Sequence, residues 1–251
     1  MTVSIVTPFK NSFPSFYKTY ESVIRQSYRN FEWVIVDDKS SETQKNYLRD
    51  LIRDPRIKVI YSSESKGAGE ARNVALEHCN GRYLTFIDSD DEWHEDFLNE
   101  MLNTINSSKG FIFSGYKRFL VDKNIYIKDF MPDSIVTKNN ILKGNPISCL
   151  ACFIDTSKLE KVPKFGSFKN RNDLVFFYRV LDQVNHAQPI KKILGQYNIT
   201  KKSISSNKFS ALINQWRVCR KIAKISFLRS IYFCTSWVIY GLKKYYFNQS
   251  L

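Results

Sequence analysis

Acidic and hydroxyl side chains gather at three places in the first ninety residues, each directly after a short apolar run. These places are Thr7-Pro8-Phe9-Lys10-Asn11, Asp37-Asp38-Lys39-Ser40 and Asp88-Ser89-Asp90-Asp91. Five carboxylates brought to one edge would repel one another unless a cation or a hydrogen-bonding ligand lay between them. Sites built from oxygen donors alone favour Mg²⁺ or Mn²⁺, which usually bind one or two carboxylates together with substrate phosphates. The pattern therefore predicts a site for a divalent cation and a nucleotide diphosphate, unless Asp and Ser serve there only as turn and cap residues.

The elements that must bring these clusters together alternate along residues 3–87. Apolar runs predict strands at 3–6, 31–36, 57–61 and 83–87, and helical spacing predicts helices at about 14–27, 42–53 and 69–78, the second with Ser41 as its cap. Strands with little polar alternation, separated by helices, predict a parallel sheet covered on both faces. Such sheets bind ligands at the carboxyl ends of their strands, which is where the three clusters fall.

A glycine-containing turn opens the third predicted helix. Lys66-Gly67-Ala68-Gly69 precedes Arg72, which lies about one turn inside the helix. Amides at a helix start and a guanidinium group can bind an anion together, although an ordinary glycine loop with a solvated Arg72 is the alternative. The sequence has no P-loop, and the first strand is not followed by Gly-x-Gly-x-x-Gly. ATPases and dehydrogenases are therefore disfavoured.

Composition limits the class of protein. The chain has 251 residues, of which 43% are hydrophobic and 15% aromatic, so disordered and fibrous classes are excluded and one large domain with a small appendage is expected. The five cysteines are odd in number and scattered, which predicts reduced, mostly buried thiols, and Cys149 and Cys152 are expected to be packed thiols more than a zinc or redox site. The first residues lack a signal-peptide pattern, which predicts a cytosolic body.

Positive charge is concentrated at the C-terminal end. The net charge is +14, and residues 201–251 contain ten Lys or Arg and no Asp or Glu. This asymmetry predicts an anionic partner: nucleic acid, nucleotide phosphates or an anionic membrane surface. From Phe209 onward the spacing predicts helix, with an apolar stripe formed by Leu212, Trp216, Cys219, Ala223 and Phe227.

Residues 230–242 are thirteen uncharged residues rich in aromatic side chains. A bilayer span needs about 20 residues, so a single transmembrane helix is disfavoured. An interfacial helix or helical hairpin is expected instead, with its aromatic side chains at the depth of the lipid headgroups. Those side chains are Trp237, Tyr240, Tyr245 and Tyr246. The alternative is that these helices pack against the rest of the chain.

Taken together, these motifs resemble the family 2 glycosyltransferases with a GT-A fold. The matching segments are Thr7-Pro8 with Asn11, Val36 to Ser40, Gly69 to Asn73, Phe86 to Trp93, Asn172 to Arg179, and Tyr197 through Ser205. The resemblance implies an α/β fold: a GT-A (Rossmann-like), mostly parallel sheet flanked by helices. It implies a domain over residues 1–207, with a nucleotide-sugar-binding half at 1–110 and an acceptor-side half at 111–207. Basic amphipathic C-terminal helices would follow at 208–251.

The resemblance also implies an activity. A hexose or N-acetylhexosamine would pass, with inversion, from a UDP-sugar to a hydroxyl of a lipid-linked oligosaccharide acceptor. The product would serve capsule, O-antigen or lipooligosaccharide synthesis in a bacterium. The enzyme would be peripheral at the cytoplasmic face of the inner membrane, its tail on anionic lipid, with no nucleic acid partner.

By the same resemblance, Asp90 would bind Mn²⁺ or Mg²⁺ and Asp173 would be the catalytic base. The cation and Arg72 would stabilise the charge of the leaving diphosphate, and the base would take the proton of the acceptor hydroxyl. The nucleotide sugar would be held by Thr7, Pro8, Phe9, Asn11, Asp38, Lys66, Arg72, Asp88 and Ser89.

Two positions depart from the family pattern, and other interpretations stay open. Lys10 stands where many members have Tyr, and Asn172 replaces the usual Glu before Asp173. From the residues alone, Asp173 is a helix cap as readily as a base. A nucleotidyltransferase is an alternative, although no Gly-rich loop ending in Lys or Arg follows the first strand. A nucleic-acid-binding module is another, and it would use the basic tail for phosphate contacts and leave the acids as bystanders.

Overall fold

The structure is a computed structural model that describes residues 2–105, 110–168, 170–200 and 208–246. Its first part is the predicted alternation of strands and helices. The elements are β1 (Val3–Phe9), α1 (Phe16–Ile24), β2 (Phe31–Asp37), α2 (Glu42–Leu51), β3 (Ile57–Tyr61), α3 (Ala68–Leu76) and β4 (Tyr83–Phe86). Ser41 caps α2 as predicted, because its side chain accepts a hydrogen bond from the backbone N of Gln44. The four strands are parallel, in the order β3-β2-β1-β4.

Strand β1 is longer than its apolar run predicts. Thr7, Pro8 and Phe9 pair in register with Ile35, Val36 and Asp37 of β2. All three are buried and belong to the strand itself, whereas the sequence pattern placed them in the loop after it.

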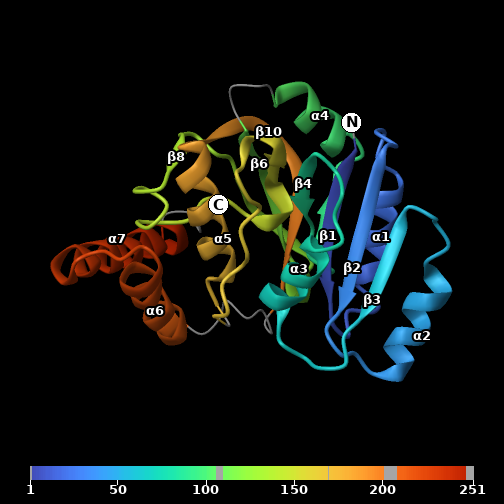
Figure 1. Ribbon diagram of the computed structural model, residues 1–251. Helices are drawn as coiled ribbons and strands as arrows, with labels where there is room; N and C mark the ends of the chain where they lie inside the picture. The colour runs from blue at the N-terminus through green and yellow to red at the C-terminus, as the bar shows by residue number, and fades with distance from the viewer. Residues whose placement is uncertain (1, 106–109, 169, 201–207, 247–251) are drawn as a thin grey trace.

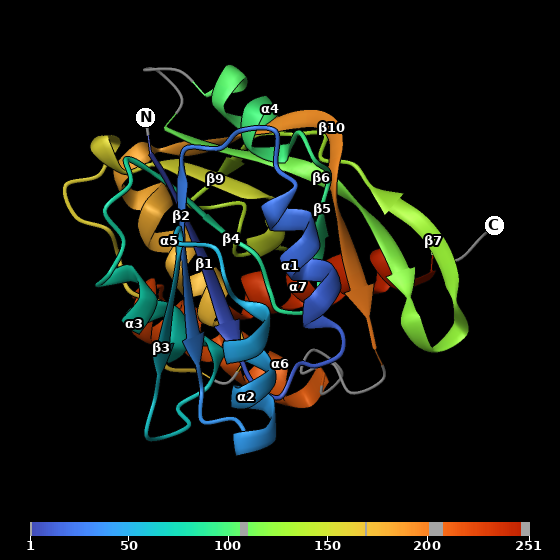
Figure 2. The ribbon, with the colours of Figure 1, turned by 90° about the vertical axis from the view of Figure 1, so that its right-hand side faces the viewer.

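The second part of the chain completes the sheet with mixed strand directions. Its elements are β5 (Glu92–Trp93), α4 (Phe97–Thr104), β6 (Phe111–Leu120), β7 (Ile125–Phe130), β8 (Val136–Thr137), β9 (Cys152–Asp155), α5 (Asn172–Val184) and β10 (His186–Ile199). β9 is antiparallel to β4 and β6, β10 is parallel to β6, and β5 is antiparallel to β10. The sheet is therefore parallel in its first four strands and mixed beyond them. The short turn between β6 and β7, visible as a hairpin in Figure 2, can join only antiparallel strands.

Helices cover both faces of the sheet, and the strand residues alternate between two hydrophobic clusters. Val6 and Val34 pack on the face that carries α3 and α5, whereas Ile5 and Ile35 pack on the face that carries α1 and α4. Figure 1 shows α3 and α5 on one side of the strands and α1 and α2 on the other. Burial on both faces explains why these strands show little polar alternation.

The C-terminal segment forms α6 (Lys208–Arg217), a π-helical turn (Val218–Ile222) and α7 (Phe227–Tyr246). The chain reverses between the two helices, so the predicted stripe is divided over a helical hairpin, which lies beyond α5 in Figure 1. Four apolar side chains of the hairpin are buried in the same cluster as Val6: Val218, Cys219, Phe233 and Cys234. The helices therefore pack on the sheet domain. Residues 201–207, at the predicted domain boundary, lie outside the described chain.

Two aromatic residues of α7 face the protein. The Trp237 ring lies 4.4 Å from the guanidinium carbon of Arg171, and the Tyr240 ring packs on Gly144. Both rings fill the contact between α7 and the sheet domain, as the packing alternative expects, and their depth in a membrane stays a prediction. The side chains of Tyr245 and Tyr246 are outside the described set. Within the described residues, no helix combines the length and apolar character needed to cross a bilayer.

Candidate active site

Arg72 and Asp88 form an ion pair at the end of β4. Arg72 donates from Nη2 to Oδ1 of Asp88, and from Nη1 to Oδ1 of Asn172 at 3.4 Å. Its guanidinium lies 5.3 Å from the centre of the Phe165 ring, and its exposed fraction is 5%. Burial is the largest influence and would lower the pKa of Arg72, but the charge and hydrogen bond of Asp88, together with Cys149 and Asp173, outweigh burial and raise the pKa. Arg72 is thus a buried, permanently charged cation, and the alternative of a solvated arginine is wrong.

The loop before α3 aims Arg72 at this edge. Gly67 precedes the helix with φ +88°, a conformation that glycine adopts without strain. Gly69 lies against α5, since a Cβ there would approach Cβ of Asn172 to 3.0 Å. The absence of a side chain at position 69 lets the two helices come close enough for Arg72 to reach Asn172.

Three carboxylates crowd together after β4. Burial and the negative charge of Asp88 raise the pKa of Asp90 to about 6, and burial with the charges of Asp90 and Asp88 raises the pKa of Asp91 well above its ordinary value. Asp91 is 1% exposed and its Oδ1 accepts a hydrogen bond from the backbone N of Asn198 at 2.9 Å. Asp91 therefore fastens β10 to this loop, while Asp88 and Asp90 are the carboxylates that can bind a ligand.

Asp88 and Asp90 suit a hard divalent cation. Their donors are oxygens only, and a cation beside them would relieve the repulsion that raises the pKa of Asp90. In the part of the chain that the structure describes, no group of three or more His, Cys, Asp or Glu side chains is arranged to hold a metal ion by itself. A Mg²⁺ or Mn²⁺ ion held here would complete its shell with water and with oxygens of a bound diphosphate.

Asp38 lies at the end of β2 and binds the loop that leads into α3. Its carboxylate accepts hydrogen bonds from the backbone N of Lys66 at 2.7 Å, from the backbone N of Gly67 at 3.1 Å and from Oγ of Ser65 at 2.8 Å. Nζ of Lys10 lies 3.6 Å from Oδ2 of Asp38. The side chain of Lys66 is exposed and lies beside Glu64, away from Asp38. Asp37 and Asp38, two of the five predicted carboxylates, therefore accept hydrogen bonds from loop amides, which compensate their charge without a cation.

The predicted nucleotide-binding residues of β1 contribute differently from one another. Oγ1 of Thr7 donates to the backbone O of Ile87 at 2.8 Å and accepts from Nε1 of Trp33 at 2.9 Å. Phe9 packs edge-on against Phe16 and is fully buried. The side chains of Thr7 and Phe9 therefore support the sheet from within the core, beside buried Pro8. Any contact of Thr7 and Phe9 with a ligand would come from their backbone.

Asn11 and Ser89 join the ends of the strands. The backbone N of Asn11 donates to Oγ of Ser40 at 2.9 Å, and Oδ1 of Asn11 accepts from the backbone N of Ser41 at 3.0 Å. The hydroxyl oxygens of Ser12 and Ser89 lie 2.7 Å apart. The carboxyl ends of β1, β2 and β4 are therefore held together by hydrogen bonds, as the prediction of a common ligand edge requires.

The first turn of α5 brings Asp173 to the same edge. Asn172, its neighbour, accepts the hydrogen bond from Arg72, and the charge of Asp173 contributes to the raised pKa of Arg72. The residue before the helix is Arg171, with φ +73°, and the helix start has no side-chain cap. The capping alternative for Asp173 is therefore wrong. Its Oδ2 accepts a hydrogen bond from Nδ2 of Asn145 at 3.3 Å.

The sequence analysis missed Asn145 and Asn198. Asn145 lies between Gly144 and Pro146, a pattern typical of a turn, but no local signal connects it with Asp173. Asn198 also donates from Nδ2 to the backbone O of Asp90 at 2.6 Å.

The prediction for the cysteines is confirmed: Cys149 and Cys152 are buried free thiols, and burial raises the pKa of both.

Comparison with known sequences adds independent evidence. The family described as Glycosyl transferase family 2 matches residues 4–162. The chain is 32% identical over 244 residues to TuaG of Bacillus subtilis (strain 168), a glycosyltransferase named for teichuronic acid biosynthesis, and 96% of each chain is covered. It is 30% identical over 248 residues to the Escherichia coli UDP-Glc:alpha-D-GlcNAc-diphosphoundecaprenol beta-1,3-glucosyltransferase WfgD, with 98% of this chain and 96% of WfgD covered.

Comparison with solved structures agrees on the fold. S. aureus TarS residues 1–349, solved with UDP-GlcNAc, matches with a TM-score of 0.76 at 19% identity over 97% of this chain and 73% of TarS. The mannosyltransferase PcManGT from Pyrobaculum calidifontis, solved with GDP-Man and Mn²⁺, matches with a TM-score of 0.67 at 14% identity over 96% of this chain and 74% of its own. The expected GT-A fold is thereby confirmed. The family match includes Asp38, Arg72, Asp88 and Asp90, and the two relatives align over 96% of their own length. The chain therefore belongs to glycosyl transferase family 2.

Proposed function

We propose that this chain transfers a hexose or N-acetylhexosamine, with inversion, from a UDP-sugar to a hydroxyl of a lipid-linked oligosaccharide. The observation that carries the proposal is the meeting of Arg72, Asp88 and the first turn of α5 at one edge of the sheet. A cation-binding pair and a separate carboxylate, Asp173, are what metal-assisted inverting transfer needs. The names of the relatives support the substrates: WfgD is named for UDP-Glc and a diphosphoundecaprenol acceptor, and TarS was solved with UDP-GlcNAc.

Donor binding would use the edge between β2 and β4. Asp38 would give up some of its hydrogen bonds to loop amides in order to bind the uracil or ribose. The backbone of β1 and the hydroxyl of Ser89 would also contact the nucleotide sugar. Asp88 and Asp90 would hold the Mn²⁺ or Mg²⁺ ion, which stabilises negative charge on the diphosphate when bound. Arg72 adds a fixed positive charge at the same edge, since the pair with Asp88 keeps it protonated.

Asp173 would accept the proton of the acceptor hydroxyl as that oxygen attacks the sugar. An alcohol has a pKa far above 7, so a carboxylate within hydrogen-bonding reach lowers the barrier. Asn145 donates to one oxygen of Asp173, which orients the carboxylate and leaves the other oxygen for the acceptor. Asn172 binds Arg72 where the family usually has Glu, so one negative charge fewer lies beside the base.

The C-terminal hairpin would hold the enzyme at an anionic membrane surface in the cytoplasm. Residues 201–251 carry ten Lys or Arg and no acidic residue. Several apolar side chains of the hairpin are largely exposed, among them Phe209 at 74%, Ile239 at 49% and Leu242 at 51%. Exposed apolar side chains next to basic ones favour the interface of an anionic bilayer, where each cation contributes about 1 kcal/mol.

A screen of nucleotide sugars by thermal unfolding, with and without Mn²⁺, tests the proposal. A ligand that binds only the folded chain raises its apparent stability, so we expect a UDP-sugar to raise the melting temperature in the presence of metal. Asp90→Ala should abolish this metal-dependent shift, and Asp50→Ala, which alters an exposed carboxylate on α2, should retain it. If no UDP-sugar stabilises the native sequence with metal present, the proposed donor is wrong.

A further inference from the structure

Two cavities lie on either side of α6 and are not part of the site described above. The first, of about 360 Å³, lies between α6 and the segment that carries Ser167 and Phe168. The second, of about 560 Å³, lies between α6 and α7. Ile213 lines both, so the two cavities are neighbours along α6.

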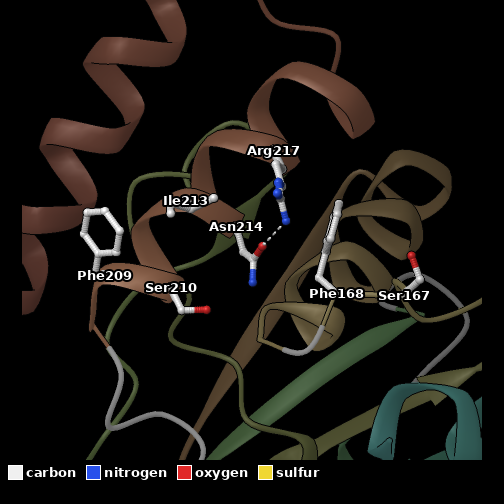
Figure 3. Close-up of a pocket in the computed structure, with 7 residues that line it drawn as sticks. All are labelled: Ser167, Phe168, Phe209, Ser210, Ile213, Asn214 and Arg217. Carbon is white, nitrogen blue, oxygen red and sulfur yellow. Dashed lines mark hydrogen bonds between the residues drawn. The ribbon is translucent and has the colours of Figure 1, made fainter. Parts of the chain in front are cut away.

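The first cavity is polar and positively charged along α6. Figure 3 shows Ser210, Asn214 and Arg217 extending from α6 toward the side where Phe168 stands. Nη1 of Arg217 donates to Oδ1 of Asn214 at 3.3 Å, so its hydrogen-bond partner is neutral, and residues 201–251 contain no acid. A guanidinium group beside hydroxyl and amide donors is suited to a phosphate group.

The second cavity is an apolar groove. Its walls are the side chains of Leu212, Ile213, Trp216, Ile231, Cys234 and Val238, together with Thr235. Ile231 is 45% exposed and Val238 is 38% exposed, so the groove is open. Covering such a surface with a hydrocarbon chain is favourable, at about 25 cal/mol for each Å² removed from water. A cationic pocket beside an apolar groove fits an amphiphile with an anionic head and a hydrocarbon tail.

We propose that α6 and α7 bind the lipid end of the acceptor, an isoprenoid diphosphate, with the diphosphate against Arg217 and the chain in the groove. This inference rests on the proposed function and adds to it the residues that recognise the lipid. The positive charge of the pocket favours this occupant over a neutral alkyl chain. Binding in a pocket also differs from general adhesion of the hairpin to a bilayer, because adhesion needs no pocket.

The position of the two cavities supports the assignment. Nδ2 of Asn170 lies 3.5 Å from Oγ of Ser210, and the guanidinium of Arg171 stacks on Trp237 of α7. The next two residues along the chain are Asn172 and Asp173, which reach the acid edge. The hairpin therefore contacts the residues that lead directly into the proposed base. A lipid bound along α6 and α7 would therefore lie on elements that contact Asn170 and Arg171, the residues next to Asn172 and Asp173 in the chain.

Binding of farnesyl diphosphate to the full chain, measured by calorimetry, tests the inference. We expect farnesyl diphosphate to bind, and farnesol and inorganic diphosphate each to bind at least about tenfold more weakly, because each fills one cavity only. UDP with Mn²⁺ should not displace it, since the donor edge is a different site. Displacement by UDP would place the probe at the donor edge and overturn the inference.

Matched variants locate the probe on the hairpin. Arg217→Gln should weaken binding about tenfold through loss of a charged hydrogen-bond donor, whereas Arg229→Gln on α7 should not. Val238→Glu places a charge in the groove and should abolish binding, whereas Leu228→Glu, at a 78% exposed position outside the groove, should not. Circular dichroism verifies that each variant folds, and Ile231→Glu replaces Val238→Glu if the latter does not.

The outcomes separate this inference from the function on which it rests. Equal losses in the Val238 and Leu228 variants, or in the Arg217 and Arg229 variants, would mean general adhesion of the hairpin and would overturn the inference. Failure of every UDP-sugar to stabilise the native chain would overturn the proposed donor instead, and farnesyl diphosphate titrations do not depend on that result.

Discussion

Arg72 contacts side chains from two segments that lie 16 and 100 residues further along the chain. Its partners differ in charge: Asp88 is a carboxylate and Asn172 is a neutral amide. Because a family member with Glu at position 172 would place a second carboxylate against Arg72, the substitution by Asn leaves more of the positive charge of Arg72 available at the acid edge. The same substitution removes a negative neighbour from Asp173, so the proposed acceptor side would be less negatively charged than the family pattern.

At this scale we predict that Asp173→Asn lowers turnover at least about 100-fold and leaves the affinity for UDP within about twofold, since a general base contributes about 10²–10⁴ to the rate. The amide keeps the size of the side chain but cannot accept the proton. Initial rates of transfer and calorimetry with UDP measure the two effects. Asp182→Asn, on the same helix and paired with Lys138, is the control and should keep full turnover. Retained turnover in Asp173→Asn would exclude it as the base.

At the scale of elements, α7 is attached to the sheet domain through side chains that flank the site. Tyr240 packs on Gly144, which precedes Asn145, and Trp237 stacks on Arg171, which precedes Asn172. The helix therefore contacts both segments that supply hydrogen bonds around Asp173. Displacement of α7 would loosen these two segments together.

Gly144→Ala tests this attachment. The added Cβ would lie 2.5 Å from Cγ of Tyr240, so the ring must move, and we expect a loss of about 1–3 kcal/mol in the free energy of unfolding. Gly241→Ala is the control, because a Cβ at position 241 meets nothing within 4 Å and alanine favours helix by about 1 kcal/mol. Denaturant unfolding measures both. Equal stability of the two variants would mean that α7 does not pack on Gly144.

The junction between β4 and β9 carries a pH-dependent contact. Nε and Nη2 of Arg82 donate to the two carboxylate oxygens of Asp155 at 3.0 and 2.8 Å. Burial alone would raise the pKa of Asp155, but hydrogen bonds from Arg82 and Ser157 outweigh it and hold the pKa below its ordinary value. A carboxyl with a lowered folded pKa stabilises the fold above its unfolded pKa, and this contribution is lost as the pH falls through the folded pKa.

We therefore predict that Asp155→Asn costs about 1 kcal/mol at neutral pH, a small value because Arg82 is 44% exposed. As the pH falls below the ordinary range of an aspartate, about 4, and through the lowered folded pKa of Asp155, the difference between the two proteins should shrink. Urea unfolding at a series of pH values measures the difference. Asp50→Asn, with an exposed carboxyl, should follow the native curve. A difference that grows on acidification would contradict the expected direction of the pH dependence.

At the scale of the whole molecule, charge and chemistry are separated. The acid edge lies in the sheet domain, whereas residues 201–251 carry +10 of the net charge of +14. In the proposed function, the basic hairpin would orient the molecule on an anionic surface, with the tail toward the lipid. The proposed membrane location depends on this asymmetry.

We expect Lys221→Gln with Lys224→Gln to weaken binding to vesicles of anionic lipid by about tenfold or more, since each cation near the surface contributes about 1 kcal/mol. Lys18→Gln with Lys123→Gln removes the same charge from exposed positions of the sheet domain and should have little effect. Sedimentation with vesicles measures the bound fraction. Raising the salt concentration should remove the difference between the two pairs, because salt screens exposed charges.

Local sequence patterns were enough to predict the parallel half of the sheet and to place the three polar clusters at one of its edges. Apolar runs, the capping residue Ser41 and the glycine turn before Arg72 are local signals, and each depends on neighbours only a few residues away. The grouping of Arg72 with Asp88 and Asp90 came from the family resemblance, because the local pattern also suited a solvated arginine. The role of Asp173 came from the family resemblance, because its own surroundings also suited a helix cap.

Which side chains contact one another across distant segments could be seen only in the three-dimensional structure. Three sets of contacts join segments that are distant in sequence. Asp38 accepts hydrogen bonds from loop amides, and Asn145 donates to Asp173. Trp237 and Tyr240 pack on the sheet domain. The antiparallel place of β9 between β4 and β6 is of the same kind. Periodicity and turn residues describe how a segment folds and which of its faces is apolar. They do not predict which other segment it contacts, because that contact depends on how complete elements pack against one another.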